Sequence, residues 1–454
     1  MLASLGGCVD PLLLARVLRF RSRLRGHERW SRERLLDEQA RALADIRLYA
    51  VQRSPFYREI HKGLDGAPLA ELPIVTKHML MTRFDEVVTD RTLRLSALQS
   101  YLASASEQPY ERRYWVSSTS GTSGRKAIVP SDRSEWSTII GSYARASDWS
   151  GGRLHVWTHS KMAVVSSTTP WHQSSRVARS VRSPFAASVR YDADMPLAQL
   201  VSALNEQQPH VLIGYASVLK LLAVEQLEGR LRIHPRSIDA SSEVFTSEAR
   251  GLVARAFGVK PFEVYAATET GGIASECERH EGLHLFEDLL IVEPVDDEYR
   301  PVPIGEVGAR TLVTVLHART LPLIRYELTD RVRLTTRRCS CALPFALIES
   351  VEGRSDDVLS LPGADGSRVA VHPVLFERLL DDVAPAGWQV GVDDGGIVVR
   401  LRVSQVPEQL GNQVREALSG TGVPPDTALR VEAVDDIPVG AAGKRPRFVR
   451  SAVG

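Results

Sequence analysis

The spacing of apolar positions divides the chain into three stretches, and the first of them is helical. Residues from about 34 to 100 carry apolar side chains at helical intervals, as in "RLLDEQARALADIRLYAVQR", until "SPFY" breaks the pattern. The basic segment "LLLARVLRFRSRLRG" near the start also favours an amphipathic helix. We therefore expect residues 1–110 to form a helical N-terminal region of a large domain.

The second stretch alternates between strands and helices. Over residues 112–352, short β-rich runs such as "HVLIGY", "RTLVTVL" and "LLIVEPV" are interspersed with helical patterns such as "SVLKLLAVEQLEG" and "SEARGLVARAFG". This alternation predicts an α/β body with doubly wound, mostly parallel sheets, which we assign to residues 111–354.

The third stretch begins where the pattern becomes rich in turns, at "VEGRSDDVLSLPGADGSRVAVHP". Beyond it, "GWQVGVDDGGIVVRLRV" and "ALRVEAVDDIP" have the pattern of strands, with a helix between them near "VPEQLGNQVREALSG". We expect residues 355–454 to form a small α+β domain, joined to the body by a hinge near Ser355.

Composition narrows the class of protein. The chain has 454 residues, of which 43% are hydrophobic and 24% charged, with a formal net charge of +1. This length exceeds one ordinary core, and the balanced charge argues against nucleic acid or an anionic membrane as partner. No run of about 18 apolar residues predicts a membrane span, and "SLGGC" lacks the charged segment of a signal peptide. We expect a cytoplasmic protein with a small-molecule partner, and the sequence leaves its oligomeric state open.

A run of hydroxyl and glycine residues, "SSTSGTSGRKAIVP" at Ser117–Pro130, is the first candidate for chemistry. Backbone N–H groups and hydroxyls in such a run can surround phosphate oxygens while a nearby basic side chain compensates their charge. No Walker A pattern passes through the run. On its own it fits a phosphate loop or a solvent-exposed polar turn. The residues suited to phosphate are Ser120, Gly121, Thr122, Ser123 and Gly124.

Three of the four cysteines fall in two short clusters. Cys277 and His280 occur in "CERH", and Cys339 and Cys341 in "CSC". Together they could close a tetrahedral structural zinc site, and His284 is the alternative fourth ligand. Unliganded, reduced cysteines are the other interpretation. So few cysteines favour a reducing compartment, and a closed four-ligand site would leave no open position for catalysis.

Five motifs in order resemble those of the adenylate-forming superfamily, which includes acyl-CoA synthetases, luciferases and the adenylation domains of peptide synthetases. They are "TSGTSGRKA", "VYAATETGG", "PLIRYELTD", "VEGRSDDV" and "PVGAAGKRPR". A narrower set is similar to the phenylacetate CoA ligase branch, with its coenzyme F390 synthetase-like and CapK-like members: "YAVQRSPFYREI", "ELPIVTKHMLMTRFDEV" and "SECERHEGLHLFED". The resemblance covers residues from about 38 to 450.

The resemblance implies which residues carry catalysis. Activating a carboxylate with ATP requires charge stabilisation at the α-phosphate and an in-line carboxylate. Lys444 matches the catalytic lysine that bridges carboxylate and α-phosphate, although a lysine in a basic tail is also commonly solvated. Glu269 matches the carboxylate that binds Mg²⁺. Thr268 beside it would contact the α-phosphate.

The nucleotide-binding residues follow from the same motifs. Tyr265 would pack on adenine, Asp330 would receive both ribose hydroxyls, and Arg354 would contact the same sugar. Asp330 could instead pair with a neighbouring arginine. Asp356 would be the hinge residue about which a mobile C-terminal domain rotates between adenylation and transfer, since one cleft then serves two reactions.

The chain departs from the family pattern in three places. It has Gly124-Arg125-Lys126 without the usual proline, so the motif leaves open which cation meets the pyrophosphate. Ala266 stands where glycine is common, and a small insertion follows the hinge, which puts the CoA contacts in doubt.

The acyl pocket is expected beside the adenine site. Its candidate residues are Tyr215, Ser217, Glu243, Ala267 and Gly271. Glycines and an aromatic wall would suit a flat aromatic acid, although Tyr215 in an apolar strand is also typical of simple packing.

These features predict an ATP-dependent ligase that forms an acyl adenylate, releases pyrophosphate and transfers the acyl group to CoA. Its cofactors and cosubstrates would be ATP, Mg²⁺ and CoA, with a structural Zn²⁺. One alternative passes the group to an amine or a carrier protein, and another activates a small oxyanion. A non-catalytic nucleotide-binding protein is the alternative from a different class.

Overall fold

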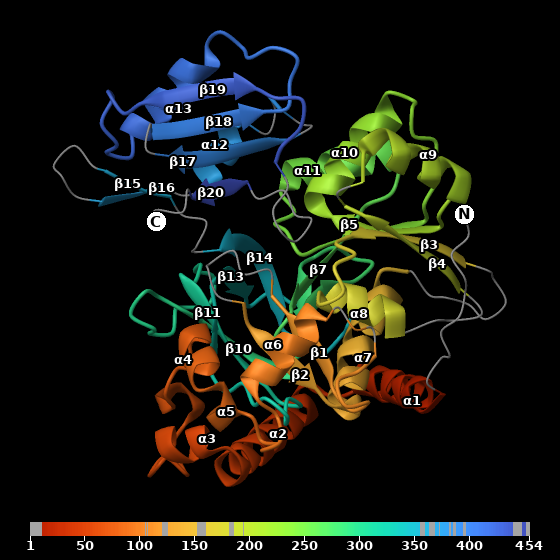
Figure 1. The fold of residues 1–454 in the computed structure, drawn as a ribbon, viewed down its shortest axis with the longest axis vertical. Coiled ribbons are helices and arrows are strands. Elements are labelled where there is room, and N and C mark those ends of the chain that lie inside the picture. Colours follow the sequence, from red (N-terminus) through yellow and green to blue (C-terminus); the bar gives the residue numbers. More distant parts are fainter. Residues whose placement is uncertain are drawn as a thin grey trace. The chain divides into compact units, whose positions relative to one another are not determined.

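The computed structural model divides into two compact units (Figure 1). The first comprises Met1–Ser160, Thr168–Ser188 and Phe262–Val351, and the second comprises Lys161–Ser167, Val189–Pro261 and Glu352–Gly454. The structure describes residues 11–104, 106, 108–119, 126–151, 160–180, 186–193, 195–354, 359–362, 368–371, 373–380, 383–384, 387–393, 396–438 and 447–450. The functional division at residues 110 and 354 stays a prediction.

Helices open the first unit, as the sequence predicts. They are α1 (Pro11–His27), α2 (Arg32–Arg53), α3 (Pro55–Ile60), η1 (Leu69–Glu71), α4 (Lys77–Thr82), α5 (Phe84–Val87) and α6 (Leu95–Ala103). Ser31 caps α2 by accepting a hydrogen bond from Arg34 N. Ser54 ends α2 and caps α3, with Pro55 at the first helical position, which explains the break at "SPFY".

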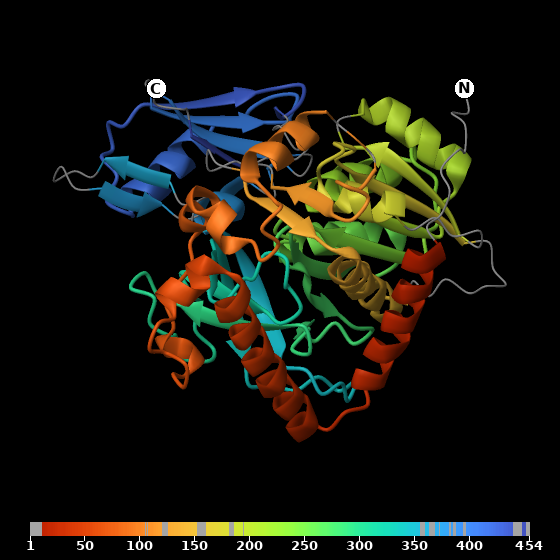
Figure 2. The same cartoon turned by 60° about the horizontal axis from the view of Figure 1, so that its bottom comes forward.

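Two further helices of this unit pack beside a short hairpin. The antiparallel strands β1 (Trp115–Ser118) and β2 (Ile128–Ser131) precede α7 (Arg133–Trp149), and α8 (Gln173–Ser180) follows later in the chain. A capping box of Asp132 and Glu135 starts α7. The helix α1 lies along α7, and Val17 and Trp136 belong to their shared apolar contact (Figure 2).

The strands of the first unit form two sheets. In the larger one the order is β13 (Asp330–Thr335), β14 (Leu347–Arg354), β9 (Leu283–Leu285), β8 (Gly271–Glu276) and β7 (Phe262–Ala267). The smaller sheet has the order β10 (Leu290–Val295), β11 (Arg310–Val315) and β12 (Tyr326–Leu328). One core of buried apolar side chains joins both sheets to the helices α3–α6.

The second unit contains two separate cores. In the first, the strand order is β6 (Ser237–Ser241), β5 (Val211–Tyr215), β3 (Ser160–Ser166) and β4 (Ala186–Asp192), packed with α9 (Leu197–Gln207), α10 (Ala216–Leu227) and α11 (Ser247–Phe257). The C-terminal part has a hairpin of β15 (Leu359–Pro362) and β16 (Arg368–Val371) and a sheet of order β19 (Leu429–Ala433), β18 (Gly396–Leu401), β17 (Trp388–Asp393) and β20 (Phe448–Arg450). It packs on α12 (Pro373–Leu380) and α13 (Leu410–Ser419).

The predicted α/β class with a small C-terminal α+β part is confirmed. The body is mixed rather than mostly parallel. The strands β3, β5 and β6 pair in parallel, whereas β7, β8 and β9 pair antiparallel. Short turns join β7 to β8 and β8 to β9, and such turns can connect only antiparallel neighbours. Among the described residues, no helix combines the length and apolar character that crossing a membrane requires.

Candidate functional site

Several predicted site residues lie outside the described residues. They are Ser120, Gly121, Thr122, Ser123, Gly124, Asp356 and Lys444. Arg354 ends β14, and only its backbone is described. Lys126 is described: its ammonium group lies 5.5 Å from the centroid of the Trp171 ring. The assigned roles of these residues therefore stay predictions.

The "TETGG" motif forms the tight turn between β7 and β8. Ala267 pairs with Gly271, and Thr270 N donates a hydrogen bond of 3.2 Å to Ala267 O. Gly271 has a φ of +77°, in the left-handed region that favours glycine. At Gly272 a Cβ would lie 2.8 Å from the Phe286 ring, so the second glycine is required by close packing. The two glycines thus shape the turn that presents the residues before them.

Glu269 is buried within this turn and held by a tyrosine. The Tyr326 hydroxyl donates a hydrogen bond of 3.1 Å to Glu269 Oε1. Burial and the nearby carboxylate keep the pKa of Tyr326 well above its usual value, so the phenol keeps its proton and remains a donor. Within the part of the chain that the structure describes, Glu269 Oε2 has no hydrogen-bond partner. One oxygen is fixed and the other remains available for a ligand.

The main chain of Thr268 is held by Gln173 from α8. Gln173 Nε2 donates to Thr268 O at 2.8 Å, and Tyr143 OH donates to Gln173 Oε1 at 2.8 Å. The sequence motifs assign no role to Gln173, Tyr143 or Tyr326. Tyr326 lies inside the "RYELTD" motif, which could have pointed to it, whereas Gln173 and Tyr143 belong to no motif.

Tyr265 and Asp330 meet within the first unit. The Tyr265 hydroxyl donates a hydrogen bond of 3.0 Å to Asp330 Oδ2, and both side chains are buried. Thr311 fixes the backbone of Asp330, since its hydroxyl donates to Asp330 O at 2.7 Å. The structure therefore brings together two residues that the motifs assign to the same nucleoside, although 65 positions separate them.

The predicted acyl-pocket residues divide between the units. Ala267 and Gly271 flank the turn of the first unit, whereas Tyr215, Ser217 and Glu243 belong to the second. Glu243 Oε2 accepts a hydrogen bond of 2.8 Å from Ser217 N at the start of α10. Glu243 Oε1 and Ser217 Oγ are buried without a hydrogen-bond partner among the described residues. Such acceptors and donors are costly when unpaired, which is typical of a ligand-facing position.

Tyr215 has a packing role that was one of its two predicted interpretations. Its hydroxyl accepts a hydrogen bond of 2.9 Å from Ser167 N, and its side chain is buried in the core around β5. Burial raises the pKa of Tyr215 to about 12. A role in substrate recognition stays a prediction.

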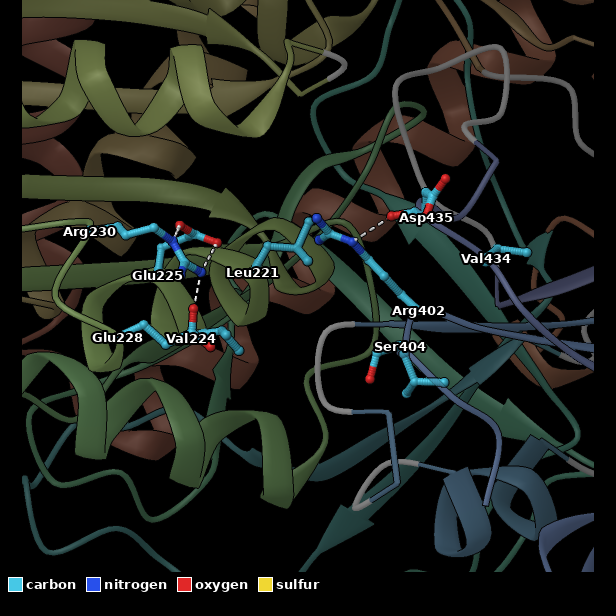
Figure 3. Close-up of a pocket in the computed structure, with 10 residues that line it drawn as sticks. Leu221, Val224, Glu225, Glu228, Arg230, Arg402, Ser404, Val434 and Asp435 are labelled. Atoms are coloured by element: carbon cyan, nitrogen blue, oxygen red, sulfur yellow. Dashed lines mark hydrogen bonds and ion pairs between the residues drawn. The ribbon is translucent and has the colours of Figure 1, made fainter. Parts of the chain in front are cut away.

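The second unit also contains a pocket of about 310 Å³ (Figure 3). Its lining residues are Leu221, Val224, Glu225, Glu228, Arg230, Arg402, Val403, Ser404, Val434 and Asp435. Both arginines have partners: Arg230 pairs with Glu225 and Glu228, and Arg402 donates to the main-chain oxygen of Asp435 at 3.1 Å. None of the motif residues lines it, so it gives no support to a nucleotide or acyl site.

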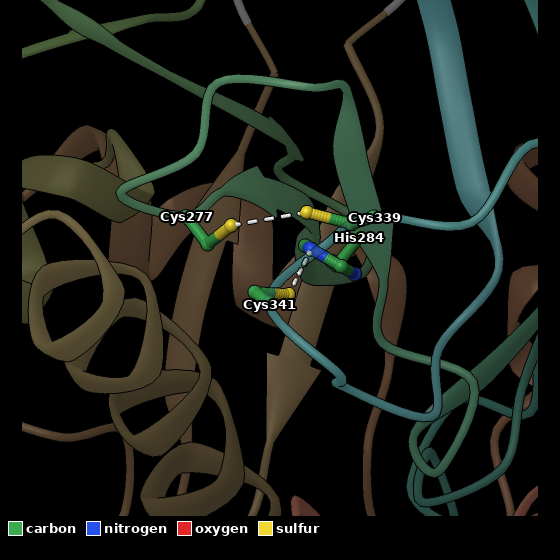
Figure 4. Close-up of side chains that lie close together, drawn as sticks. All are labelled: Cys277, His284, Cys339 and Cys341. Carbon is green, nitrogen blue, oxygen red and sulfur yellow. Dashed lines mark hydrogen bonds between the residues drawn. The ribbon is translucent and has the colours of Figure 1, made fainter.

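The cysteine clusters come together in the first unit with one histidine (Figure 4). The group consists of Cys277, His284, Cys339 and Cys341, whose potential ligand atoms all lie within 4.8 Å of one another. Cys277 Sγ is 3.6 Å from Cys339 Sγ, and Cys341 Sγ is 3.2 Å from His284 Nε2. Thiolates bound at about 2.3 Å to one tetrahedral zinc lie roughly 3.8 Å apart, so the donor set fits that metal.

His284 replaces His280 in this group, which corrects the predicted C-x-x-H pairing. His284 lies in β9 and pairs with Ser275 in β8, close to Cys277 at the end of β8. His280 has a φ of +52° in the intervening turn. Its ring centroid is 4.4 Å from that of Phe262, and Nδ1 is 3.5 Å from Glu276. The register of the β8–β9 hairpin, rather than closeness in sequence, brings His284 and not His280 next to the cysteines.

Burial of the group favours the uncharged forms of its histidine and cysteine side chains as long as no cation is bound. Burial lowers the pKa of His284 to about 4, so the imidazole is neutral near pH 7. Burial also raises the pKa of the Cys277 and Cys339 thiols. Glu281 holds the "CSC" turn by accepting hydrogen bonds of 2.7 and 2.9 Å from Ser340 N and Oγ. A bound cation would displace the thiol protons.

Sequence comparison finds relatives with one shared name, and no family profile matches the chain. The chain is 26% identical over 369 residues to a phenylacetate-coenzyme A ligase of Thermus thermophilus, covering 77% of this chain and 76% of that protein. It is 25% identical over 285 residues to a phenylacetate-coenzyme A ligase of Pseudomonas putida, covering 60% of each.

Structural comparison finds the same fold over nearly the whole chain. A crystal structure of 2-hydroxyisobutyryl-CoA ligase in the postadenylation state, with 2-HIB-AMP, matches with a TM-score of 0.71 and 19% identity, covering 92% of this chain and 90% of that one. The same ligase with 2-HIB-AMP and CoA in the thioesterification state gives a TM-score of 0.59. The chain is thus similar in sequence to phenylacetate-coenzyme A ligases, as its motifs suggested, and it shares the fold of an acyl-CoA ligase.

Proposed function

We propose that this chain, a relative of the phenylacetate-coenzyme A ligases, is an AMP-forming acid–CoA ligase. A carboxylic acid reacts with ATP to give an acyl adenylate and pyrophosphate, and the CoA thiol then displaces AMP to give a thioester. The observation that carries the proposal is the joint placement of Tyr265 with Asp330 and of Glu269 with Tyr326 in one unit. These motif residues come from distant parts of the chain, yet hydrogen bonds assemble them.

Each assembled group supplies one part of nucleotide binding. Asp330 presents a carboxylate to the ribose hydroxyls, and Tyr265 holds it in one orientation through the bond at 3.0 Å. The Thr268–Glu269 turn faces the phosphates, and the serine–glycine run Ser120–Gly124 receives the pyrophosphate. Lys444 compensates the charge that develops at the α-phosphate and carboxylate.

Glu269 has the chemistry to hold magnesium. Mg²⁺ prefers oxygen ligands and is commonly bound by one or two carboxylates together with substrate phosphates. Glu269 fits this because Oε1 is fixed by Tyr326 while Oε2 has no partner among the described residues. When bound, the ion would offset phosphate charge and orient the leaving group.

We propose an aromatic acid as the substrate, as the shared name of the sequence relatives suggests. Glu243 Oε1 and Ser217 Oγ add buried polar atoms that still need partners. An amino or hydroxyl substituent on the ring would supply them. The substrate panel should therefore pair plain aromatic acids with amino- and hydroxy-substituted ones.

The Cys277–His284–Cys339–Cys341 group is proposed as a structural zinc site. Four ligands complete a tetrahedral shell, so the ion would hold the β8–β9 hairpin to the "CSC" turn rather than take part in the reaction. The reduced thiols that it needs agree with a cytoplasmic location.

The test is ATP–pyrophosphate exchange with a panel of aromatic acids, each with and without CoA. Exchange with one acid and CoA-stimulated AMP release would support the ligase. Exchange without any stimulation of AMP release by CoA would indicate that the acyl acceptor is an amine or a carrier protein. No exchange with any acid would contradict the ligase and favour an oxyanion substrate or a non-catalytic nucleotide-binding protein. Lys444→Ala should lower exchange by orders of magnitude while ATP binding persists.

A further inference from the structure

Side chains from three elements that are distant in sequence form hydrogen bonds with the turn between β7 and β8. Gln173 of α8 holds Thr268 O at 2.8 Å, and Tyr326 of β12 holds the Glu269 carboxylate at 3.1 Å. Ser142 of α7 accepts a hydrogen bond of 3.0 Å from Gly272 N. A tight turn makes few hydrogen bonds of its own, so these external contacts decide where its side chains point.

Gln173 is the most constrained of these contacts. Its side chain is buried, and both ends of its amide are used. The carbonyl of Thr268 can only accept, so the amide nitrogen faces it and the amide oxygen faces the Tyr143 hydroxyl. Burial raises the pKa of Tyr143, which keeps this hydroxyl protonated and able to donate. The result is a chain of two hydrogen bonds with a single donor direction: Tyr143 donates to Gln173, and Gln173 donates to Thr268.

The same segment also reaches the hairpin that leads into the serine–glycine run. Ser118 N, at the end of β1, donates a hydrogen bond of 2.9 Å to Trp171 O. The Lys126 ammonium group lies over the Trp171 ring, with 5.5 Å to its centroid. Trp171 therefore contacts residues on either side of the Ser120–Gly124 run, and Gln173 contacts the Thr268–Glu269 turn.

We propose that Gln173 is a positioning residue for adenylation: it fixes the main chain of Thr268, so that Thr268 and Glu269 meet the phosphates in a productive orientation. The inference rests on the proposed function and adds a residue that no motif contains. In this role Gln173 acts through the turn, by its contact with Thr268 O, and not by binding substrate or metal itself. Misplacing a reacting group by about 1 Å can cost on the order of 100-fold in rate, which sets the scale of the effect.

The effect should fall on the rate rather than on substrate affinity. Adenine and ribose are assigned to Tyr265 and Asp330, which Gln173 does not touch. The turn instead meets phosphates whose charge changes during the reaction. Contacts made more strongly in the transition state than in the ground state appear in kcat and leave KM nearly unchanged.

The test compares Gln173→Met with wild type. Methionine keeps the length and volume of glutamine but cannot donate to Thr268 O. We expect the kcat of ATP–pyrophosphate exchange to fall by about 10- to 100-fold, with both KM values within about 3-fold. Tyr143→Phe, which removes only the anchor of Gln173, should give a smaller fall in the same direction. Gln199→Met, at an exposed position in α9, is the matched control and should behave as wild type.

A second measurement tests the role of Gln173 without requiring that the acid substrate be known. ATP affinity is measured by calorimetry with Mg²⁺ and with EDTA for each variant. Wild type should bind ATP more tightly with Mg²⁺, and Gln173→Met should lose a part of this gain no larger than the about 3-fold change allowed in KM, while matching wild type in EDTA. Circular dichroism and thermal unfolding establish that the variant is folded.

The outcomes separate this inference from the proposed function. A folded Gln173→Met with wild-type kcat and wild-type Mg²⁺ gain would overturn the positioning role. A loss of activity that only follows the fraction of unfolded protein would overturn it too. If wild type exchanges with no acid, the ligase proposal fails, and the Mg²⁺ gain alone decides the role of Gln173. If wild type binds no ATP, both fail together.

Discussion

The hydroxyl of Tyr265 donates a hydrogen bond of 3.0 Å to Oδ2 of Asp330, which ties the end of β7 to the start of β13. The bond fixes the carboxylate that the ribose hydroxyls are proposed to meet. An acceptor aimed in advance costs less entropy when the ligand binds.

Tyr265→Phe should therefore weaken ATP binding with little effect on chemistry. The bond orients the Asp330 carboxylate but does not itself contact ATP, so we expect the KM for ATP to rise by roughly 10-fold or less, with kcat within about 3-fold. Initial-rate measurements of exchange over a range of ATP concentrations test this. Tyr299→Phe, which removes a hydroxyl bonded to Glu327 at 3.0 Å in the same unit, is the matched control. A fall in kcat with an unchanged KM would contradict the ribose assignment.

The hydrogen bond between Glu269 and Tyr326 predicts that variants at the two positions will differ in how their exchange rate depends on Mg²⁺ concentration. Glu269→Gln removes the charge that would bind the ion and should lower the kcat of exchange by about 100-fold or more. Tyr326→Phe keeps that charge but frees the carboxylate, so its main effect should be a higher Mg²⁺ concentration for half-maximal rate. Titration of Mg²⁺ at saturating ATP distinguishes the two variants. An unchanged Mg²⁺ requirement in both would remove Glu269 from the metal site.

Sequence motifs single out Tyr265, Glu269 and Asp330 as candidates because short local patterns contain them. They could not identify Gln173, whose contact with the Thr268 carbonyl joins residues 95 positions apart and needs only a suitable length and polarity. The residues of the proposed zinc site show the same limit. Cys277 was singled out by the short pattern "CERH", but the choice of His284 over His280 depends on how β8 and β9 pair, which spacing along the chain does not reveal. Similarly, only the turns that join β7, β8 and β9 make that part of the sheet antiparallel.

The cysteine group predicts one bound zinc per chain. Purified wild-type protein should contain close to one equivalent, measured by plasma mass spectrometry, and Cys339→Ser should lose most of it. Thermal unfolding of Cys339→Ser should occur at a lower temperature, since a structural site links metal affinity to folding. Cys8→Ser makes the same chemical change at the cysteine that belongs to neither sequence cluster, and it should alter neither property. Equal zinc content in both variants would contradict the site.

Glu243 predicts a test of substrate selection. Its Oε1 is buried without a partner among the described residues, while Oε2 accepts from Ser217 N. Glu243→Gln can still accept that bond but loses the charge. If the ring carries an amino or hydroxyl group at this position, kcat/KM for that acid should fall about 10-fold, while the unsubstituted acid changes little. Equal losses for both acids would mean that Glu243 only caps α10.

The buried pair of Arg145 and Asp288 predicts how stability depends on pH. Arg145 Nη2 lies 2.6 Å from Asp288 Oδ2, both side chains are 1% exposed, and His27 Nδ1 contacts the same oxygen at 2.6 Å. Burial opposes ionisation of Asp288, but Arg145 and His27 together hold its pKa below the usual value. The unfolded chain therefore binds this proton more readily, so the stabilisation is present above about pH 4 and is lost as the pH falls further.

Asp288→Asn should lower the free energy of unfolding by an amount that depends on pH. Without the carboxylate, Arg145 remains buried and uncompensated among the rings of Trp149, Phe286 and Phe345, and loss of one partner of a buried pair costs about 3–5 kcal/mol. Urea unfolding at pH 7 should show this loss, and the difference from wild type should shrink as the pH is lowered toward 3. Asp296→Asn, which breaks an exposed pair with Arg300, should leave the urea midpoint nearly unchanged. A deficit for Asp288→Asn that stays constant with pH would mean that packing, and not the charge on Asp288, stabilises this part of the fold.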